Sequence, residues 1–122
     1  MTKKEITQNF LKLAASGHSH EAFRLHVHED FKHHNAYFKG DGETLMLAME
    51  ESARKNPNKI FTIHHIIEEE NLVAVHSHLK QTPADIGFAV VHILKFKEDK
   101  IIELWDLGQH IPIETINENG MF

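Results

Sequence analysis

The chain has 122 residues, of which 41% are hydrophobic and 25% charged, so we expect one globular domain spanning residues 1–122. Its formal net charge is -5 and its lysines and arginines are scattered, which argues against nucleic acid as a partner. The absence of cysteine excludes disulfides, thiolate zinc sites and cysteine nucleophiles.

Three helices are predicted in the first half of the chain. The first begins at the Thr2–Glu5 capping box and stops before Gly17, a residue suited to a helix C-terminus. The second covers residues 19–27. The third is capped by Asp41 and ends near Pro57, because the residue before a proline disfavours helical geometry.

After the third helix the apolar pattern becomes that of strands. Four strands are predicted, at residues 60–68, 72–81, 88–96 and 101–106. Short turns join them, so they should form an antiparallel meander. Residues 31–35 are expected to be extended or a short strand, and residues 113–122 a lid or an extended arm.

This order of elements predicts an α+β fold, a cone-shaped barrel in which three N-terminal helices pack on one face of a curved antiparallel sheet. The cone should enclose an apolar cavity. The opposite face carries Trp105 and aliphatic side chains, which would be exposed in a monomer. We therefore expect a homodimer that forms through the outer sheet face.

A carboxylate and an imidazole fall within the apolar final hairpin. Asp106 shares the parity of Ile102 and Leu104, and His92 should lie within about one residue of it on the neighbouring strand. Titratable groups in such a sheet are candidates for acid/base chemistry, with the pKa of Asp106 raised by burial. The alternatives are a solvated Asp106 on a frayed strand and a core histidine satisfied by a backbone partner.

Two further histidines, His76 and His78, should share one face of a strand. That is a known metal-ligand spacing, but a site needs further ligands, which His34, His92 and Asp106 could supply. The alternatives are a hydrogen-bonding role in the pocket and a solvated strand face.

Other neighbouring histidines are expected to matter less. His26 and His28 fall at the end of a predicted helix and should lie on the surface. His64 and His65 are adjacent on a strand, so they should point to opposite faces.

The dipeptide His34-Asn35 precedes an aromatic pair. It could hold a carbonyl or enolate oxygen in the cavity, or be a polar corner leading into a loop. The chain has no glycine-rich phosphate loop and no serine nucleophile elbow. Any chemistry should therefore be proton transfer or metal-assisted.

Several of these strings together resemble those of a known family. The strings are His34-Asn35, His76-Ser77-His78, Val90–Phe96, Lys100–Asp106 and Asn119–Phe122. They are similar to SnoaL-like polyketide cyclases of the nuclear transport factor 2-like superfamily, and the likeness is sharpest from Val73 onward.

The resemblance implies a cone-shaped barrel, usually a homodimer, and chemistry without a metal or cofactor. It implies that Asp106 is the acid/base of an aldol-type ring closure, that His92 assists it and that Asn35 contacts the substrate.

We accordingly expect a cyclase or isomerase that forms an enolate from a small carbonyl compound. The expected catalytic residues are Asp106, His92 and His34, and the expected ligand-binding residues are Asn35, His76, His78 and Val90. The alternatives are a non-catalytic binding module of the same fold and a metal site on His76 and His78.

The chain carries no apolar run typical of a signal peptide and none near the roughly 20 residues of a membrane span. We expect a cytoplasmic protein whose partner is a small molecule, with no membrane or nucleic acid involved.

Overall fold

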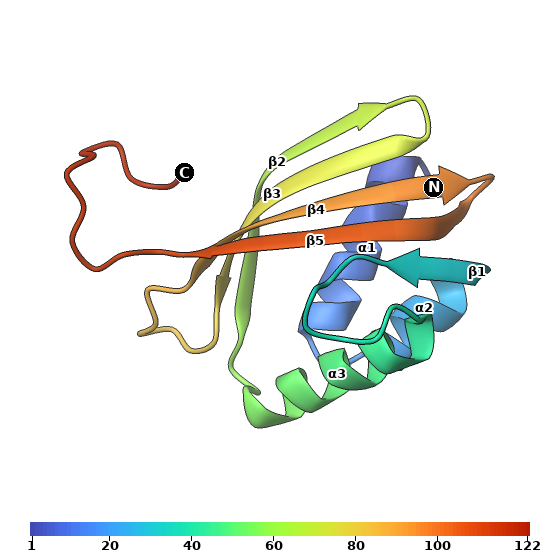
Figure 1. The fold of residues 1–122 in the computed structure, drawn as a ribbon, viewed down its shortest axis with the longest axis horizontal. Helices are drawn as coiled ribbons and strands as arrows, with labels where there is room; N and C mark the ends of the chain where they lie inside the picture. The colour runs from blue at the N-terminus through green and yellow to red at the C-terminus, as the bar shows by residue number, and fades with distance from the viewer.

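The computed structural model describes residues 1–122 as three helices and one five-stranded sheet (Figure 1). The elements are α1 (Lys3–Ala15), α2 (Ser19–His26), β1 (Val27–His33), α3 (Gly42–Lys55), β2 (Ile60–Glu69), β3 (Leu72–Lys80), β4 (Phe88–Lys97) and β5 (Lys100–His110). This order confirms the predicted α+β fold. No helix has both the length and the apolar character needed to cross a membrane.

Local sequence signals set the helix boundaries as predicted. The Thr2 hydroxyl accepts a hydrogen bond from the Glu5 backbone N–H at 3.1 Å, and the Glu5 carboxylate accepts one from the Thr2 N–H at 2.8 Å. Asp41 caps α3 by accepting from the Thr44 backbone N–H at 2.9 Å. Each cap satisfies backbone donors that the first helical turn leaves free.

The strand order is β1-β5-β4-β3-β2. Strands β2 to β5 form the predicted antiparallel meander, but the sheet is mixed because β1 pairs with β5 in parallel. The meander is confirmed, and β1 adds to it a parallel edge strand where residues 31–35 were expected to be extended or a short strand. The second helix ends one residue earlier than expected, since Val27 adopts extended backbone angles and opens β1.

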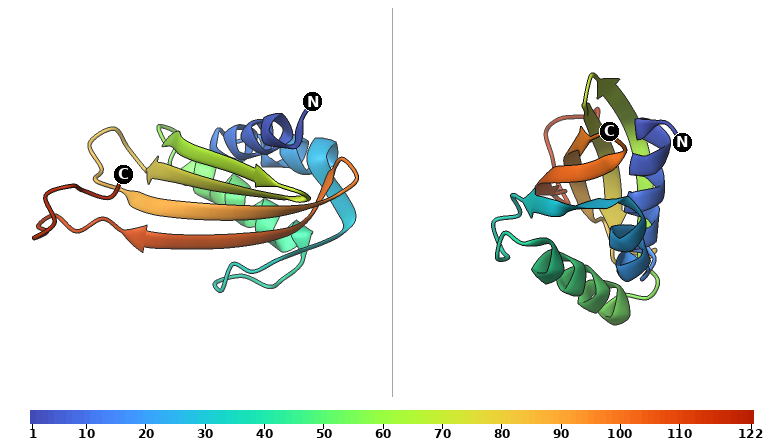
Figure 2. Two further views of the ribbon diagram at one scale, coloured as in Figure 1. Left: turned by 90° about the horizontal axis from the view of Figure 1, so that it is seen from above. Right: turned by 90° about the vertical axis from the view of Figure 1, so that its right-hand side faces the viewer.

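All three helices lie on one side of the curved sheet, which Figure 2 shows from two directions. Phe10 of α1 and Phe23 of α2 have ring centroids 5.4 Å apart, and Phe23 lies 5.6 Å from Phe31 of β1. These rings belong to one core that includes buried residues of β3, β4 and β5. Burial of this apolar area is the main force that holds the helices against the sheet.

A bulge in the last hairpin determines which residues of β5 face the helices. Lys95 pairs with Glu103 but Phe96 pairs with Ile101, so Ile102 is an extra residue on β5. Ile101 and Leu104 are consequently both fully buried, whereas Ile102 is only half-buried. Asp106 shares the inward face with Leu104, as predicted, but not with Ile102.

A second bulge gathers histidines on the outer face, the sheet face turned away from the helices. Ile63 pairs with Ser77 and His65 with His76, so His64 is the extra residue of β2. Both His64 and His65 have ring contacts with His76, at centroid distances of 6.2 and 5.3 Å. The prediction that these two neighbours face opposite sides is wrong, because the bulge interrupts the alternation.

The C-terminal residue closes back onto this outer face. Phe122 stacks on His64, His78 and His76, with centroid distances of 4.5, 4.6 and 5.3 Å. Residues 113–122 have no helix or strand and form the curl at the C-terminal end in Figure 1. The segment is thus an extended arm against the outer face and not a lid on the inner one.

His26 also departs from expectation. It is 7% exposed, and its Nε2 lies 2.7 Å from the Asn9 Oδ1 of α1. Burial, together with the charge of Lys100, lowers the pKa of His26. The prediction of a surface position fails because the last turn of α2 packs against α1.

Candidate functional site

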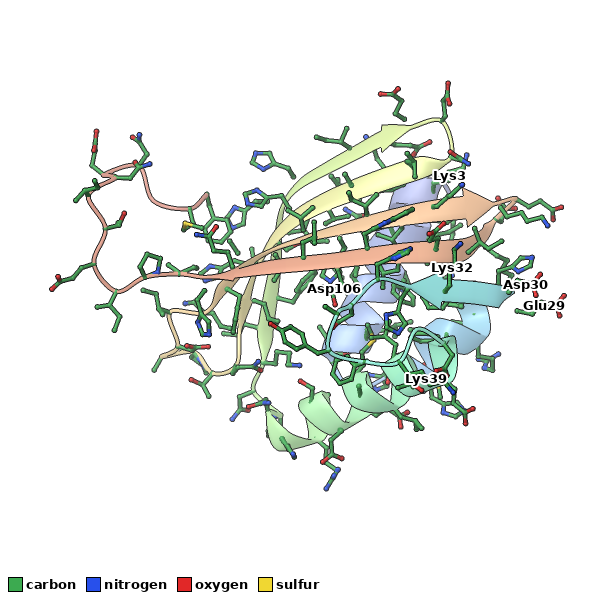
Figure 3. The ribbon with its side chains drawn as sticks, viewed as in Figure 1. Lys3, Glu29, Asp30, Lys32, Lys39 and Asp106 are labelled. Carbon is green, nitrogen blue, oxygen red and sulfur yellow. The ribbon has the colours of Figure 1, made fainter.

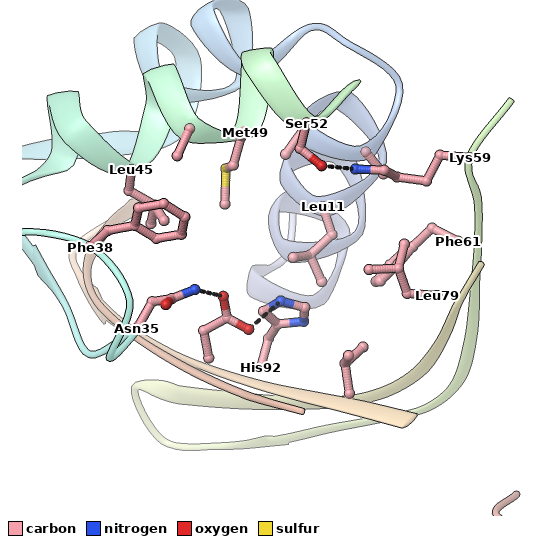
Figure 4. A pocket seen from close by; sticks show the side chains of 15 residues that line it. Leu11, Asn35, Phe38, Leu45, Met49, Ser52, Lys59, Phe61, Leu79 and His92 are labelled. Atoms are coloured by element: carbon pink, nitrogen blue, oxygen red, sulfur yellow. Dashed lines mark hydrogen bonds and ion pairs between the residues drawn. The ribbon is translucent and has the colours of Figure 1, made fainter. Parts of the chain in front are cut away.

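The inward face of the sheet brings together Asp106, His92 and Asn35. Asp106 and His92 are direct cross-strand partners, and Asp106 Oδ1 lies 3.3 Å from His92 Nε2. The Asn35 side-chain amide donates a hydrogen bond to Asp106 Oδ2 at 2.8 Å. Both carboxylate oxygens are therefore held, and Figure 4 shows Asn35 and His92 on either side of the carboxylate they bind.

The loop after β1 fixes the orientation of the Asn35 amide. The Asn35 Oδ1 accepts a hydrogen bond from the Tyr37 backbone N–H at 3.0 Å, so its NH2 group must face Asp106. The Asn35 backbone N–H donates to His33 Nδ1 at 3.1 Å, while His33 Nε2 donates to the Lys39 carbonyl at 2.6 Å. Buried His33 thus braces the loop, a role that the sequence pattern did not indicate.

Two opposing effects act on the pKa of Asp106. Burial raises it, but the hydrogen bond and charge of His92 and the hydrogen bond from Asn35 outweigh burial, so the pKa is lowered overall. The prediction of a raised pKa is wrong, because it considered the effect of burial among apolar side chains and not the hydrogen bonds from His92 and Asn35. Asp106 is consequently an ionised carboxylate at neutral pH. In Figure 3 it lies near the middle of the sheet, whereas Glu29 and Asp30 lie at the rim.

A cavity of about 230 Å³ opens between this group and the helices. Ten of its fifteen lining residues are hydrophobic, and Val90 is among them, as predicted. The five polar lining residues are Asn35, Ser52, Lys59, His92 and Asp106. The volume lies below the roughly 300–1,000 Å³ of pockets that hold drug-sized ligands. The cavity therefore suits a small, largely apolar molecule.

His92 is the more enclosed partner of Asp106. It is 9% exposed, and its ring meets Phe61 in an edge contact with centroids 6.1 Å apart. Its Nδ1 is buried and has no hydrogen-bond partner in the protein. The sequence left open that His92 is a core histidine satisfied by a backbone group. The structure shows no such backbone partner for its ring.

His34 does not reach the cavity. Its Nε2 donates a hydrogen bond to Glu103 Oε2 at 2.6 Å, and its ring stacks on Trp105 with centroids 5.1 Å apart. Both partners lie on the outer face. The side chains of consecutive extended residues alternate, so the geometry that directs Asn35 inward directs His34 outward. The structure thus separates His34 from the catalytic group to which it was assigned.

His76 and His78 also lie on the outer face and do not line the cavity, since Ser77 is the inward residue of that string. His76 Nδ1 lies 3.1 Å from His65 Nδ1, and His78 Nε2 donates to the Ile86 carbonyl at 2.8 Å. No group of three or more histidine, aspartate or glutamate side chains is arranged to hold a metal ion. Of the three further ligands considered, His92 and Asp106 belong to the opposite face, and the His34 Nε2 is paired with Glu103.

No sequence pattern singled out Lys59 and Ser52, which line the side of the cavity away from Asn35 and His92 (Figure 4). The Lys59 ammonium donates a hydrogen bond to Ser52 Oγ at 2.7 Å. Lys59 follows Pro57 in a polar turn, a context typical of a surface lysine. Helices α1 and α3 supply further apolar side chains to the cavity, among them Leu11 and Met49.

The sequence matches one family of known proteins. A family model described as SnoaL-like polyketide cyclase matches residues 5–115. No curated protein matches the sequence significantly.

Solved structures share the fold at low sequence identity. A Bacillus cereus protein provisionally described as a polyketide cyclase is 24% identical, with a TM-score of 0.74 over 85% of this chain and 72% of that one. An Agrobacterium tumefaciens protein provisionally described as an isomerase of the SnoaL-like family is 14% identical, with a TM-score of 0.72 over 89% of this chain and 99% of that one. A nuclear transport factor 2-like protein of unknown function from Cytophaga hutchinsonii is 16% identical, with a TM-score of 0.70 over 89% and 91%. These likenesses concern the fold.

Proposed function

The chain belongs to the SnoaL-like polyketide cyclase family, and from that premise we propose that it is an enzyme that forms an enolate from a small carbonyl compound. The observation that carries the proposal is the Asp106 carboxylate, ionised and held by two donors at the wall of an otherwise apolar cavity. Such a group has the chemistry of a general base.

In the proposed reaction Asp106 removes a proton from a carbon beside a carbonyl group. The electron pair moves onto the carbonyl oxygen, and the resulting enolate oxygen needs a hydrogen-bond donor. Asn35 has a second amide hydrogen, and the His92 imidazole lies beside it with Nε2 3.3 Å from Asp106 Oδ1. Within apolar walls, these fixed dipoles stabilise developing charge more strongly than water does.

The enolate then has two outcomes. If its carbon attacks a second carbonyl, a carbon–carbon bond forms and the new alkoxide takes back the proton that Asp106 holds, which completes an aldol-type ring closure. If the proton returns to a different carbon, the product is an isomer. Neither route requires a metal or a cofactor, and the cavity volume favours a compound smaller than a polycyclic polyketide.

The test is deuterium exchange at the acidic C–H of small ketones and 1,3-dicarbonyl compounds in heavy water, followed by proton NMR. The protein should accelerate exchange, and Asp106→Asn should reduce that acceleration by roughly a hundredfold or more. Glu103→Gln is the matched control, because Glu103 is a histidine-paired carboxylate of the same strand on the outer face. Full activity of Asp106→Asn would remove Asp106 as the base, and no exchange with the unmodified protein would leave a non-catalytic binding module as the function.

We also propose that the protein is a homodimer that pairs through the outer face. Val91, Ile93 and Trp105 are half-exposed there, and Leu107 is 57% exposed. Apolar side chains clustered on one sheet face are typical of a surface that a second copy covers.

A further inference from the structure

The cavity has two polar ends, and the proposed reaction uses only one of them. Asp106, His92 and Asn35 form the first end. Lys59 and Ser52 form the second, and hydrophobic side chains supply the rest of the lining. Figure 4 shows Ser52 and Lys59 beside α3, across the cavity from Asn35 and His92.

Lys59 differs from the other cations near α3 in having no acidic partner. Arg54 and Lys55 both pair with Glu51, whereas no carboxylate lies within 4.0 Å of the Lys59 ammonium. Its protein partner is the Ser52 hydroxyl. An ammonium group has three N–H donors, so two remain free for a ligand.

The position of Lys59 carries an energetic cost. The side chain is half-buried beside an apolar cavity, and burial lowers the pKa of Lys59. A cation in such a place is unfavourable unless it gains a partner of opposite charge. The protein supplies no such partner, so an anionic group on a ligand in the cavity is suited to pair with Lys59.

We propose that Lys59, with Ser52, binds a carboxylate of the ligand, so that the substrates are oxo acids. This inference rests on the proposed function for the identity of the cavity as the ligand site. Asp106 repels an anion at its own end, while Lys59 attracts one at the other. The two charges therefore orient the ligand, with its neutral carbonyl end toward Asp106 and its carboxylate toward Lys59. A charge-assisted hydrogen bond in this setting should favour binding by about tenfold.

The experiment measures the affinities of straight-chain oxo acids, from oxopentanoate to oxononanoate, and of their uncharged methyl esters. Binding is followed by ligand-observed NMR titration. At least one acid should bind about tenfold more tightly than its ester. Lys59→Met should abolish that preference while leaving ester binding intact, which also shows that the variant is folded. Lys55→Met is the control, because Lys55 pairs with Glu51 on the exposed side of α3 and should leave the preference unchanged.

Three results would overturn the inference: no acid binds, no acid is preferred over its ester, or Lys59→Met keeps the preference. Asp106→Asn separates this inference from the proposed function, because it should lose deuterium exchange and still prefer acids. If the unmodified protein shows no exchange but prefers acids through Lys59, the catalytic proposal fails and the carboxylate site stands.

Discussion

Asp106 and His92 are direct cross-strand partners on β5 and β4, and the Oδ1 of the carboxylate lies 3.3 Å from the Nε2 of the imidazole. Burial raises the pKa of Asp106, and His92 is the leading cause that lowers it. His92 is therefore the main group that keeps the buried Asp106 ionised, and replacing His92 should change the pKa of Asp106.

Replacing His92 should move the pH dependence of deuterium exchange. In His92→Gln, burial still raises the pKa of Asp106 and the largest opposing effect is gone, so the pKa rises. Because the base is active when ionised, the acid limb of the pH–rate profile should shift to higher pH. Rates measured from pH 3 to 8 would show the shift. His34→Gln should leave the limb in place, and a matching shift in that variant would return His34 to the catalytic group.

His26 should make stability depend on pH in the weakly acidic range. Its pKa in the folded protein lies below the ordinary value of 6.5, so the unfolded chain binds more protons between the two values. Stability is then fully present above pH 6.5 and declines as pH falls from there through the lowered value. The urea unfolding midpoint of His26→Gln should therefore vary less with pH over this window than the midpoint of the unmodified protein. His20→Gln, at a side chain 75% exposed, should reproduce the unmodified curve.

The contact of Phe122 with the outer face should be visible in solution. An aromatic ring stacked on His64, His76 and His78 shifts their imidazole proton resonances, and Phe122→Ala should remove those ring-current shifts. The unfolding midpoint should change little, because Phe122 is 41% exposed. Ile116→Ala, in the same arm but fully exposed, is the control. Unchanged histidine resonances in Phe122→Ala would mean that the arm does not rest on the sheet.

Analytical sedimentation should show a dimer, and a charge introduced on the outer face should weaken its association. Leu107→Glu places a carboxylate among the apolar side chains of that face, which should shift the protein toward monomer at micromolar concentration. Leu25→Glu introduces the same charge at an exposed position of α2 and should leave the dimer intact. A monomeric unmodified protein, or a dimer insensitive to Leu107→Glu, contradicts the proposed interface.

Features governed by neighbouring residues could be read from the sequence. The caps at Thr2 and Asp41 act within one helical turn, so their patterns placed the starts of α1 and α3 correctly. The turn between β4 and β5 is short, and a short turn sets the pairing of both strands. That local constraint is why the proximity of Asp106 and His92 was predictable from the order of residues alone.

Features that depend on distant parts of the chain were decided by the tertiary structure. The parallel pairing of β1 with β5, and the outward direction of His34, follow from how the first strand meets the last. The bulges at His64 and Ile102 reverse the alternation on which face assignments depend. Lys59 reaches the cavity only because α3 packs over the sheet. Helix caps and hairpin turns depend on interactions among a few neighbouring residues, so the sequence alone predicts them. Bulges, strand order and the second polar end of the cavity arise from packing between segments far apart in the chain, which local pattern does not encode.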